Sequence, residues 1–291
     1  STMDRAQALA DLFAFSGSTV AITGGGGDLP GAVAQGLAPL GLRLALLDLS
    51  LEKAEEKAQA VRSVGGEAAA FHCDVLDPES VRAALDQIRS LYGDVHYLIN
   101  GAGGNVKAGS ADLSFVDEID ASGSASEGSR TFFDLEAKDL RFTVDLNLVG
   151  TMIPSQVFGR EMAAAGQGSI VNFASMSGIT PLTKVGAYSA AKAAVANFTQ
   201  WLSVHLSRVG VRVNALAPGF FMTEQLKFLH IDQTTGDYTP RAKEVLAHTP
   251  MKGYGDPEDL VGAVVWLLSD AARFVTGSVL VIDGGFSSYS I

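Results

Sequence analysis

The sequence predicts an α/β fold in which a seven-stranded parallel sheet carries helices on both faces. Short apolar runs alternate with longer helical patterns along the chain, as in repeated strand–helix–strand units. The composition, 47% hydrophobic with 32 glycines, is typical of this class. A chain of 291 residues could hold two domains, but no linker or repeat divides it. We therefore expect one catalytic domain over residues 1–291.

Each expected strand is a short apolar run that ends near a polar or turn-forming residue. The seven strands are expected at 18–23, 43–48, 67–74, 95–100, 169–175, 211–218 and 278–283. Helices are expected at 29–40, 52–64, 78–91, 136–165, 187–209 and 257–268. The inserts 101–135 and 219–256 are too long for simple connections, and long loops in compact domains are usually functional. We expect these inserts to form a substrate mouth.

The first strand runs into four consecutive glycines, Gly24 to Gly27, before the first long helix. Glycine suits a turn that cradles a dinucleotide pyrophosphate, because the backbone must turn tightly and approach phosphate closely. Asp28 and Pro30 stand where such loops usually carry glycine. Proline is tolerated in a first helical turn, and Asp28 could cap the helix. The loop is interpreted as a phosphate cradle, with an ordinary glycine-rich turn as the alternative.

The second strand ends at Asp48, which indicates the cofactor. A carboxylate there accepts hydrogen bonds from the adenosine ribose and repels a 2′-phosphate. The next residues, 49–52, read LSLE and contain no cation for that phosphate. The sequence therefore favours NAD over NADP. The alternative is that Asp48 is an ordinary turn residue at the end of a strand.

Polar or turn-forming residues end six of the expected strands. Each could be an ordinary turn former, but the carboxyl ends of parallel strands meet at one edge, where such sheets bind their ligands. One binding crevice explains the whole set better than coincidence does. The set is Thr23, Asp48, Asp74, Asn100, Ser175 and Pro218.

The catalytic group is expected where Ser175 is followed by Tyr188 and Lys192. Positions i and i+4 of a helix share one face, which brings the Lys192 ammonium near the Tyr188 phenol. A neighbouring cation favours the phenolate, so Tyr188 could act as a general acid or base. Ser175 could hold the substrate oxygen. A solvated surface pair on an alanine-rich helix is the alternative for Tyr188 and Lys192.

Together these patterns resemble the short-chain dehydrogenase/reductase family over essentially the whole chain, and hence its doubly wound Rossmann fold. The resemblance implies that Tyr188 is the acid/base, while Lys192 lowers its pKa and binds the nicotinamide ribose. It also implies that Ser175 stabilises the carbonyl or alcohol and that Asn147 supports a water path for the proton. The matching motifs are TGGGGDLPG, NGAG at 100–103, DLNLVG around Asn147, Ser175, YSAAK, PGFFMT at 218–223 and VIDGG.

The same resemblance supplies a set of expected NAD contacts around the strand ends. Pro218, Gly219, Phe221 and Thr223 would surround the nicotinamide carboxamide. The full expected set is Gly24, Gly26, Gly27, Asp28, Leu29, Asp48, Asp74, Val75, Asn100, Gly101, Ala102, Tyr188, Lys192, Pro218, Gly219, Phe221 and Thr223.

A subgroup of D-mannonate oxidoreductases (fructuronate reductases) is similar further along the chain, at FFDL, APGFFMTEQ and DGGFSSYS. The resemblance implies reversible hydride transfer between D-mannonate and D-fructuronate. A sugar-acid carboxylate needs a cation and its hydroxyls need polar partners. Lys107, Lys184 and Asn105 are the candidates, each with a solvated surface position as the alternative. Another polyol or keto sugar, a 3-oxoacyl thioester, or a non-catalytic NAD-sensing role remain open.

Charge and cysteine content limit the partners. A net charge of −11 disfavours nucleic-acid binding. No apolar run is long enough for a membrane span, and the first residues lack the apolar core of a secretion signal. The lone Cys73 fits a reducing cytoplasm. The five histidines show no metal-ligand spacing, so no metal is expected. The family resemblance implies a homotetramer in which the helices at 136–165 and 187–209 pair between subunits.

Overall fold

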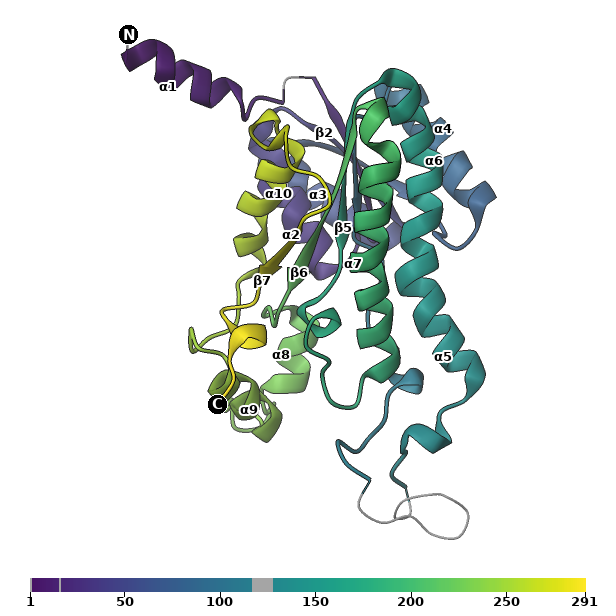
Figure 1. The fold of residues 1–291 in the computed structure, drawn as a ribbon, viewed down its shortest axis with the longest axis vertical. Coiled ribbons are helices and arrows are strands. Elements are labelled where there is room, and N and C mark those ends of the chain that lie inside the picture. Colours follow the sequence, from purple (N-terminus) through teal and green to yellow (C-terminus); the bar gives the residue numbers. More distant parts are fainter. Residues whose placement is uncertain (1, 16, 117–127) are drawn as a thin grey trace.

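Seven parallel strands form one sheet in the order β3-β2-β1-β4-β5-β6-β7 (Figure 1). The computed structural model describes residues 2–15, 17–116 and 128–291. All seven expected strands are present within a few residues of their expected bounds. They are β1 (Thr19–Thr23), β2 (Arg43–Asp48), β3 (Glu67–His72), β4 (Tyr97–Asn100), β5 (Gly168–Phe173), β6 (Val211–Pro218) and β7 (Val279–Ile282).

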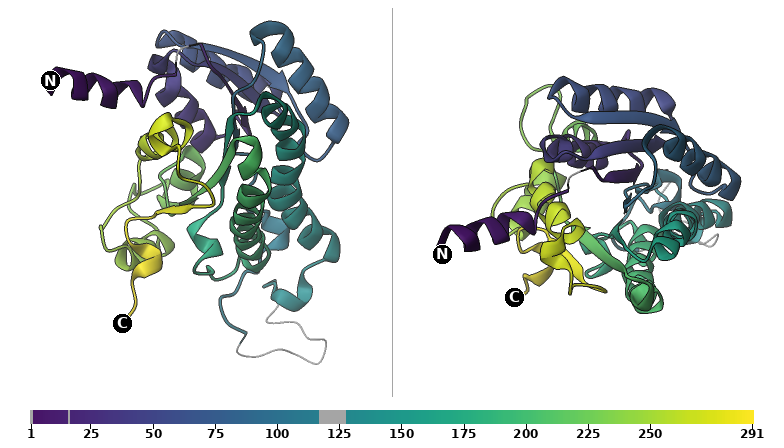
Figure 2. Two further views of the ribbon diagram at one scale, coloured as in Figure 1. Left: turned by 45° about the horizontal axis from the view of Figure 1, so that its top comes forward. Right: turned by 90° about the horizontal axis from the view of Figure 1, so that it is seen from above.

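Helices cover both faces of this sheet, which confirms the doubly wound arrangement (Figures 1 and 2). One face carries α2 (Asp28–Leu37), α3 (Leu51–Ser63) and α10 (Val261–Leu268). The other carries α4 (Pro78–Tyr92), α6 (Gly150–Ala165) and α7 (Gly186–Leu206). The strand order reverses between β1 and β4, so the crevice beyond their carboxyl ends is the expected ligand position.

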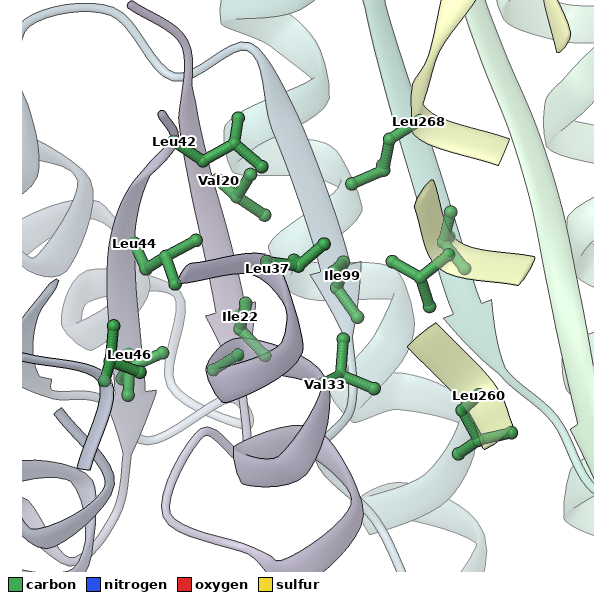
Figure 3. Packing of buried hydrophobic residues seen from close by; sticks show 14 of the residues in the cluster. Val20, Ile22, Val33, Leu37, Leu42, Leu44, Leu46, Ile99, Leu260 and Leu268 are labelled. Carbon is green, nitrogen blue, oxygen red and sulfur yellow. The ribbon is translucent and has the colours of Figure 1, made fainter. Parts of the chain in front are cut away.

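The strands sort their side chains by alternation, because successive residues of a strand point to opposite faces. In β1, Val20 and Ile22 belong to the core under α2 and α10, whereas Ala21 belongs to the core under α4 and α6. Figure 3 shows Val20 and Ile22 in the first core, where Val33 and Leu37 of α2 reach down toward the sheet. Burial on both faces explains why these strands are apolar at nearly every position.

The helix expected at 136–165 is interrupted. It consists of α5 (Ala137–Val144), a π-helical turn at Asp145–Val149, and α6. The wide turn buries the side chain of Asn147, whose Nδ2 donates to the carbonyl of Thr143 at 2.8 Å. A side chain that bonds to the backbone in this way competes with the regular helical ladder.

The second insert contains helices that the sequence pattern did not predict. They are α8 (Glu224–His230) and α9 (Pro240–His248). Thr223 and Thr239 cap them, accepting hydrogen bonds from the N–H groups of Leu226 and Ala242. Both helices are short, seven and nine residues, and therefore depend on packing against the rest of the chain.

A further unexpected helix, α1 (Thr2–Asp11), projects away from the sheet and buries none of its residues (Figure 1). In the first insert, the described parts include short 3₁₀ turns at Lys107–Gly109 and Phe132–Asp134. The composition of the stretch ASGSASEGS in this insert predicts a flexible tip. Residues 117–127, which hold most of that stretch, lie outside the described residues.

Candidate active site

A cavity of about 420 Å³ opens at the carboxyl edge of the sheet and holds most of the expected site residues. Those that line it are Gly24, Gly27, Asp28, Leu29, Asp48, Gly101, Ser175, Tyr188, Lys192, Pro218, Gly219, Phe221 and Thr223. The cavity also has lining residues that the sequence analysis did not assign. These are Pro30, Gly103, Gly104, Phe173, Ala174, Phe220, Gln225 and Leu226.

The glycine turn after β1 is shaped by close backbone contacts. Gly24 has φ of +64°, and a Cβ there would lie 2.7 Å from the Cα of Ala102. Its carbonyl accepts the N–H of Gly27 at 2.8 Å. Gly27 is the N-cap of α2 and offers no side-chain acceptor, so the first N–H groups of the helix stay without a side-chain cap. Such an uncapped helix start fits the phosphates of a dinucleotide.

The prediction that Asp28 caps α2 is wrong. Gly27 occupies the cap position with extended backbone angles, and Asp28 is the first helical residue. Its carboxylate instead lies 3.8 Å from the Nζ of Lys57 on α3. Pro30 does stand in the first helical turn, where its ring would be 2.7 Å from a Cβ at Gly101. A glycine at 101 is therefore what permits this proline.

Both carboxylate oxygens of Asp48 hold backbone groups. One accepts the N–H of Gly26 at 3.0 Å and the other accepts the N–H of Ser50 at 2.9 Å. Each oxygen keeps a lone pair for a further donor, such as a ribose hydroxyl. Gly26 itself packs against Lys53 of α3, since a Cβ there would lie 2.7 Å from the Cβ of Lys53. Lys53, the residue directly after the LSLE stretch, thus has the base of its side chain next to Gly26.

Five of the expected cofactor-binding residues do not line the cleft and instead contact other parts of the protein. They are Gly26, Asp74, Val75, Asn100 and Ala102. The buried Asn100 amide donates to Ser155 at 3.0 Å and to Asn172 at 2.8 Å. Asp74 accepts the N–H of Leu76 at 3.0 Å. Ala102 donates its N–H to Thr23 at 3.2 Å, which ties the end of β1 to the loop after β4.

Tyr188 and Lys192 face the same cleft from α7, as predicted, with the ammonium 5.8 Å from the ring centroid. The side chain of Lys192 is buried, and its Nζ donates to the carbonyl of Phe173 at 2.7 Å. Burial lowers the pKa of Lys192 to about 8. That value leaves the amine mostly charged at neutral pH.

The expectation that Lys192 lowers the pKa of Tyr188 stays a prediction. Burial raises the pKa of the phenol, and a hydrogen bond with Ser175 offsets part of that rise. The ammonium is directed to the carbonyl of Phe173 rather than to the phenol oxygen. Tyr188 is therefore protonated at neutral pH and suited to donate a proton.

Ser175, two residues beyond β5, is oriented by its own turn. Its Oγ accepts the N–H of Ser177 at 3.2 Å and the hydroxyl of Ser177 at 2.9 Å. The sequence analysis did not assign Ser177, although a serine two positions on is the signal for such a turn. With both of these bonds accepted, the Ser175 hydroxyl still has its own proton to donate, and its partner is the hydroxyl of Tyr188.

Asn147 connects the π-helical turn to the loop after β4. Its Oδ1 accepts the N–H of Gly104 at 2.9 Å and its Nδ2 donates to the carbonyl of the same residue at 2.9 Å. A Cβ at Gly103 would lie 2.6 Å from Asn147 Oδ1 and 3.3 Å from Lys192 Nζ. The asparagine thus fixes the loop that borders the catalytic lysine, while its role in a proton path stays a prediction.

The three candidates for substrate recognition are exposed and do not line the cavity. Asn105 accepts the hydroxyl of Ser110 at 2.9 Å. Lys184 has a left-handed φ of 73°, and its carbonyl accepts the N–H of Ala111 at 2.8 Å. This bond joins the first insert to the loop before α7, so Lys107 and Lys184 belong to connected segments.

Metal and membrane features are absent from the part of the chain that the structure describes. No group of three or more histidine, cysteine, aspartate or glutamate side chains there could hold a metal ion. No described helix has the length and apolar character needed to cross a membrane. Cys73 is buried, and burial raises the pKa of its thiol to about 12.

This chain is similar to known proteins both in sequence and in fold. The family model of the short chain dehydrogenases matches residues 18–233. An uncharacterized oxidoreductase, UxuB, of Bacillus subtilis is 43% identical over 276 residues, covering 94% of this chain and 96% of its own.

Two solved structures are informative. A Haemophilus influenzae protein provisionally described as a D-mannonate oxidoreductase, solved with bound NAD, is 41% identical with a TM-score of 0.90 and covers 97% of this chain and 99% of its own. A gluconate 5-dehydrogenase of Burkholderia cenocepacia, solved with NADP and tartrate, is 29% identical with a TM-score of 0.80 and covers 96% and 99%.

Proposed function

The chain belongs to the short-chain dehydrogenase family, and from this premise we propose that it transfers hydride between NAD(H) and a sugar acid, with D-mannonate and D-fructuronate as the substrate pair. The observation that carries the proposal is the meeting of Ser175, Tyr188 and Lys192 in one cleft beside an uncapped helix start. The 41% identity to the NAD-bound Haemophilus influenzae protein supports the same interpretation.

The side chains suit the reduction of a ketone. When bound, NADH supplies a hydride to the carbonyl carbon and is released as NAD⁺. The Ser175 hydroxyl donates a hydrogen bond to the carbonyl oxygen, and Tyr188 delivers the proton that this oxygen needs. A phenol whose pKa is raised by burial holds that proton at neutral pH. Lys192, charged below about pH 8, would hold the hydroxyls of the nicotinamide ribose when the cofactor is bound.

NAD is proposed over NADP because of Asp48. Its carboxylate lies in the cleft and is held in place by Gly26 and Ser50, so a 2′-phosphate would meet a fixed negative charge. The family includes users of both cofactors, since the gluconate 5-dehydrogenase structure holds NADP.

The test is the loss of NADH absorbance on addition of D-fructuronate, and its reappearance with NAD⁺ and D-mannonate. We expect turnover with both sugar acids and a preference for NADH over NADPH. Tyr188→Phe serves as the matched control, because it removes one hydroxyl from the same fold. No turnover with either acid, but turnover with another keto sugar or polyol, would remove the named substrates and keep the class.

Two other functions make distinct predictions. A 3-oxoacyl thioester reductase would turn over acetoacetyl thioesters, and the net charge of −11 disfavours docking of an acidic carrier protein. A non-catalytic NAD sensor would bind NADH without any turnover. The intact pair of Tyr188 and Lys192 in the cleft favours an enzyme.

We also propose a homotetramer in which α6 and α7 pair between subunits. A cavity of about 830 Å³ between α4, α6 and α7 lies away from the catalytic group. Its wall includes Trp201, whose side chain is 58% exposed and stacks between Phe198 and His205. Light scattering after gel filtration should give four chains, and Trp201→Asp should reduce that number. A wild-type monomer would refute the assembly.

The proposed location is a reducing cytoplasm. The lone cysteine is buried with a strongly raised pKa, so it neither forms an internal disulfide nor reacts readily. Retention of full NADH oxidation in the presence of a thiol reductant is the expected behaviour.

A further inference from the structure

We propose that Lys57 is a positioning residue for the dinucleotide: by pairing with Asp28 it neutralises the acid at the mouth of the phosphate cradle, so that α2 can accept a pyrophosphate. The inference rests on the NAD(H) part of the proposed function. It does not depend on which substrate is reduced.

Asp28 creates an electrostatic difficulty for the cofactor. It is the first residue of α2 and lines the cleft beside Gly24, Gly27 and Leu29. A pyrophosphate at this helix start carries negative charge, and a carboxylate in the same opening repels it. The acid gives no compensating cap, because its side chain accepts no hydrogen bond from the helix start.

Lys57, on the neighbouring helix α3, compensates the negative charge of Asp28. Its Nζ lies 3.8 Å from an oxygen of the Asp28 carboxylate. The two side chains are 28% and 34% exposed, so water screens the pair only in part. Asp28 lines the cleft and Lys57 does not. The lysine is therefore placed to act on the cofactor through the aspartate.

A glycine on α2 makes the approach of the lysine possible. A Cβ at Gly31 would lie 2.7 Å from the Cδ of Lys57 and 3.0 Å from its Cε. The aliphatic stem of Lys57 thus crosses α2 where there is no side chain, and this path brings its ammonium to Asp28. Gly31 does not line the cleft, so it offers a way to displace the lysine while keeping both charges.

The other charges around the loop explain why pyrophosphate binding needs the Lys57–Asp28 ion pair. Asp48 already places a fixed carboxylate beside Gly26, where it serves the ribose. A second, uncompensated carboxylate at Asp28 would stand near the phosphates. With Lys57 paired to Asp28, the local charge at the helix start is close to zero, and the uncapped N–H groups can act on the anion.

The experiment is a double-mutant cycle on NADH binding, measured by the fluorescence change on titration without substrate. Lys57→Met keeps the stem and removes the charge, and we expect about 5- to 10-fold weaker binding. Asp28→Asn should bind as well as wild type or about 2-fold tighter. In the double variant the neutral amide at position 28 needs no neutraliser, so binding should return to within about 2-fold of Asp28→Asn.

Two smaller ligands show whether Lys57 acts on the pyrophosphate of the cofactor. ADP-ribose keeps the pyrophosphate and should show the same losses as NADH, whereas adenosine has no phosphate and should show none. The effect of Lys57→Met should also shrink at high salt, because the charges are partly exposed. Gly31→Ala should weaken NADH binding in the same direction by displacing the lysine. Lys138→Met, which removes a charge from an exposed pair with Glu136 on α5, controls for net charge.

Two results would overturn the inference. One is equal weakening in Lys57→Met and in the double variant, because the lysine would then act independently of Asp28. The other is equal weakening for adenosine, which would indicate damage to the loop. If wild type binds NADH but reduces no sugar acid, the substrate proposal fails and this inference stands.

Discussion

Around the glycine turn after β1, backbone contacts fix nearly every residue, whereas around Lys107 and Lys184 the candidate recognition groups are exposed side chains on loops. Gly24 touches Ala102, and Asp48 holds two backbone N–H groups. The substrate side has a few loop-to-loop bonds, such as Ala111 to the carbonyl of Lys184. The cofactor end is thus preorganised by the sheet, and the substrate end depends on segments added to it.

The second insert is also a segment added to the sheet, but more contacts hold it to the rest of the chain. Next to the cleft, Gly255 donates its N–H to the carbonyl of Phe220 and accepts the N–H of Met222, both at 2.9 Å. His230 Nδ1 bonds to the hydroxyl of Tyr254 at 2.7 Å. A small core of Met176, Val245 and Phe286 joins the turn after Ser175 to α9 and to the last residues of the chain. Substitutions at the substrate side should accordingly change specificity more than chemistry, and this contrast can be tested.

The largest effect is expected at Tyr188. Tyr188→Phe removes the proton donor and should lower kcat by about 10³-fold, since general acid catalysis contributes on the order of 10²- to 10⁴-fold. NADH binding should change by less than about 2-fold, because the ring and its packing remain. Stopped-flow turnover and NADH titration measure the two quantities. Turnover within a few-fold of wild type would refute the role of the phenol.

Next comes Asp48, which tests how rigid the cofactor end is. Asp48→Ala removes one hydrogen bond to the glycine loop at Gly26, one to Ser50 at the start of α3, and the charge that repels a 2′-phosphate. We expect NADH binding to weaken about 50-fold and the NADH-to-NADPH ratio of kcat/KM to fall further. Asp77→Ala, which removes a carboxylate that caps α4, is the matched control. An unchanged cofactor ratio would contradict the assignment.

A smaller effect concerns stability and pH. The folded-state pKa of Lys192, about 8, lies below its ordinary value of 10.5. Between these values the folded state binds fewer protons than the unfolded one, so stability rises with pH in this window. The cost of burying the amine is fully present below pH 8. From about pH 7 to about pH 9.5 it should fall by about 2 kcal/mol.

Urea unfolding of wild type and Lys192→Met at these two pH values isolates that effect. The difference between the two proteins should change by about 2 kcal/mol, with wild type gaining as pH rises. A difference that stays constant over the window would show that Lys192 is not buried as described.

The smallest effects are expected on the substrate side. Lys107→Met and Lys184→Asn each remove an exposed charge, and asparagine tolerates the left-handed backbone at 184. If either ammonium binds the substrate carboxylate, KM for D-fructuronate should rise about 3- to 10-fold with kcat little changed. Lys184→Arg, which keeps the charge, is the control. Equal KM values in all variants would exclude both lysines.

The sequence predicted the strands, and the position of Tyr188 and Lys192 in one cleft, because these features are local. The short apolar runs that mark buried strands and the four-residue spacing from Tyr188 to Lys192 are properties of neighbouring residues in the chain. It missed α8 and α9, which are short, capped helices; Val245 of α9 packs against the distant residues Met176 and Phe286. It also misjudged Asp28, since its partner Lys57 comes from a neighbouring helix.

What the sequence by itself determined is the parallel sheet, the crevice at its carboxyl edge, and the side chains that meet there, because short apolar runs and helical spacing can be recognised without any distant partner. Only the tertiary structure decided the protonation of Tyr188, the partner of Asp28 and the shape of the second insert. Each of these depends on burial or on a charge from a distant segment, and desolvation and Coulomb interactions act through space rather than along the chain.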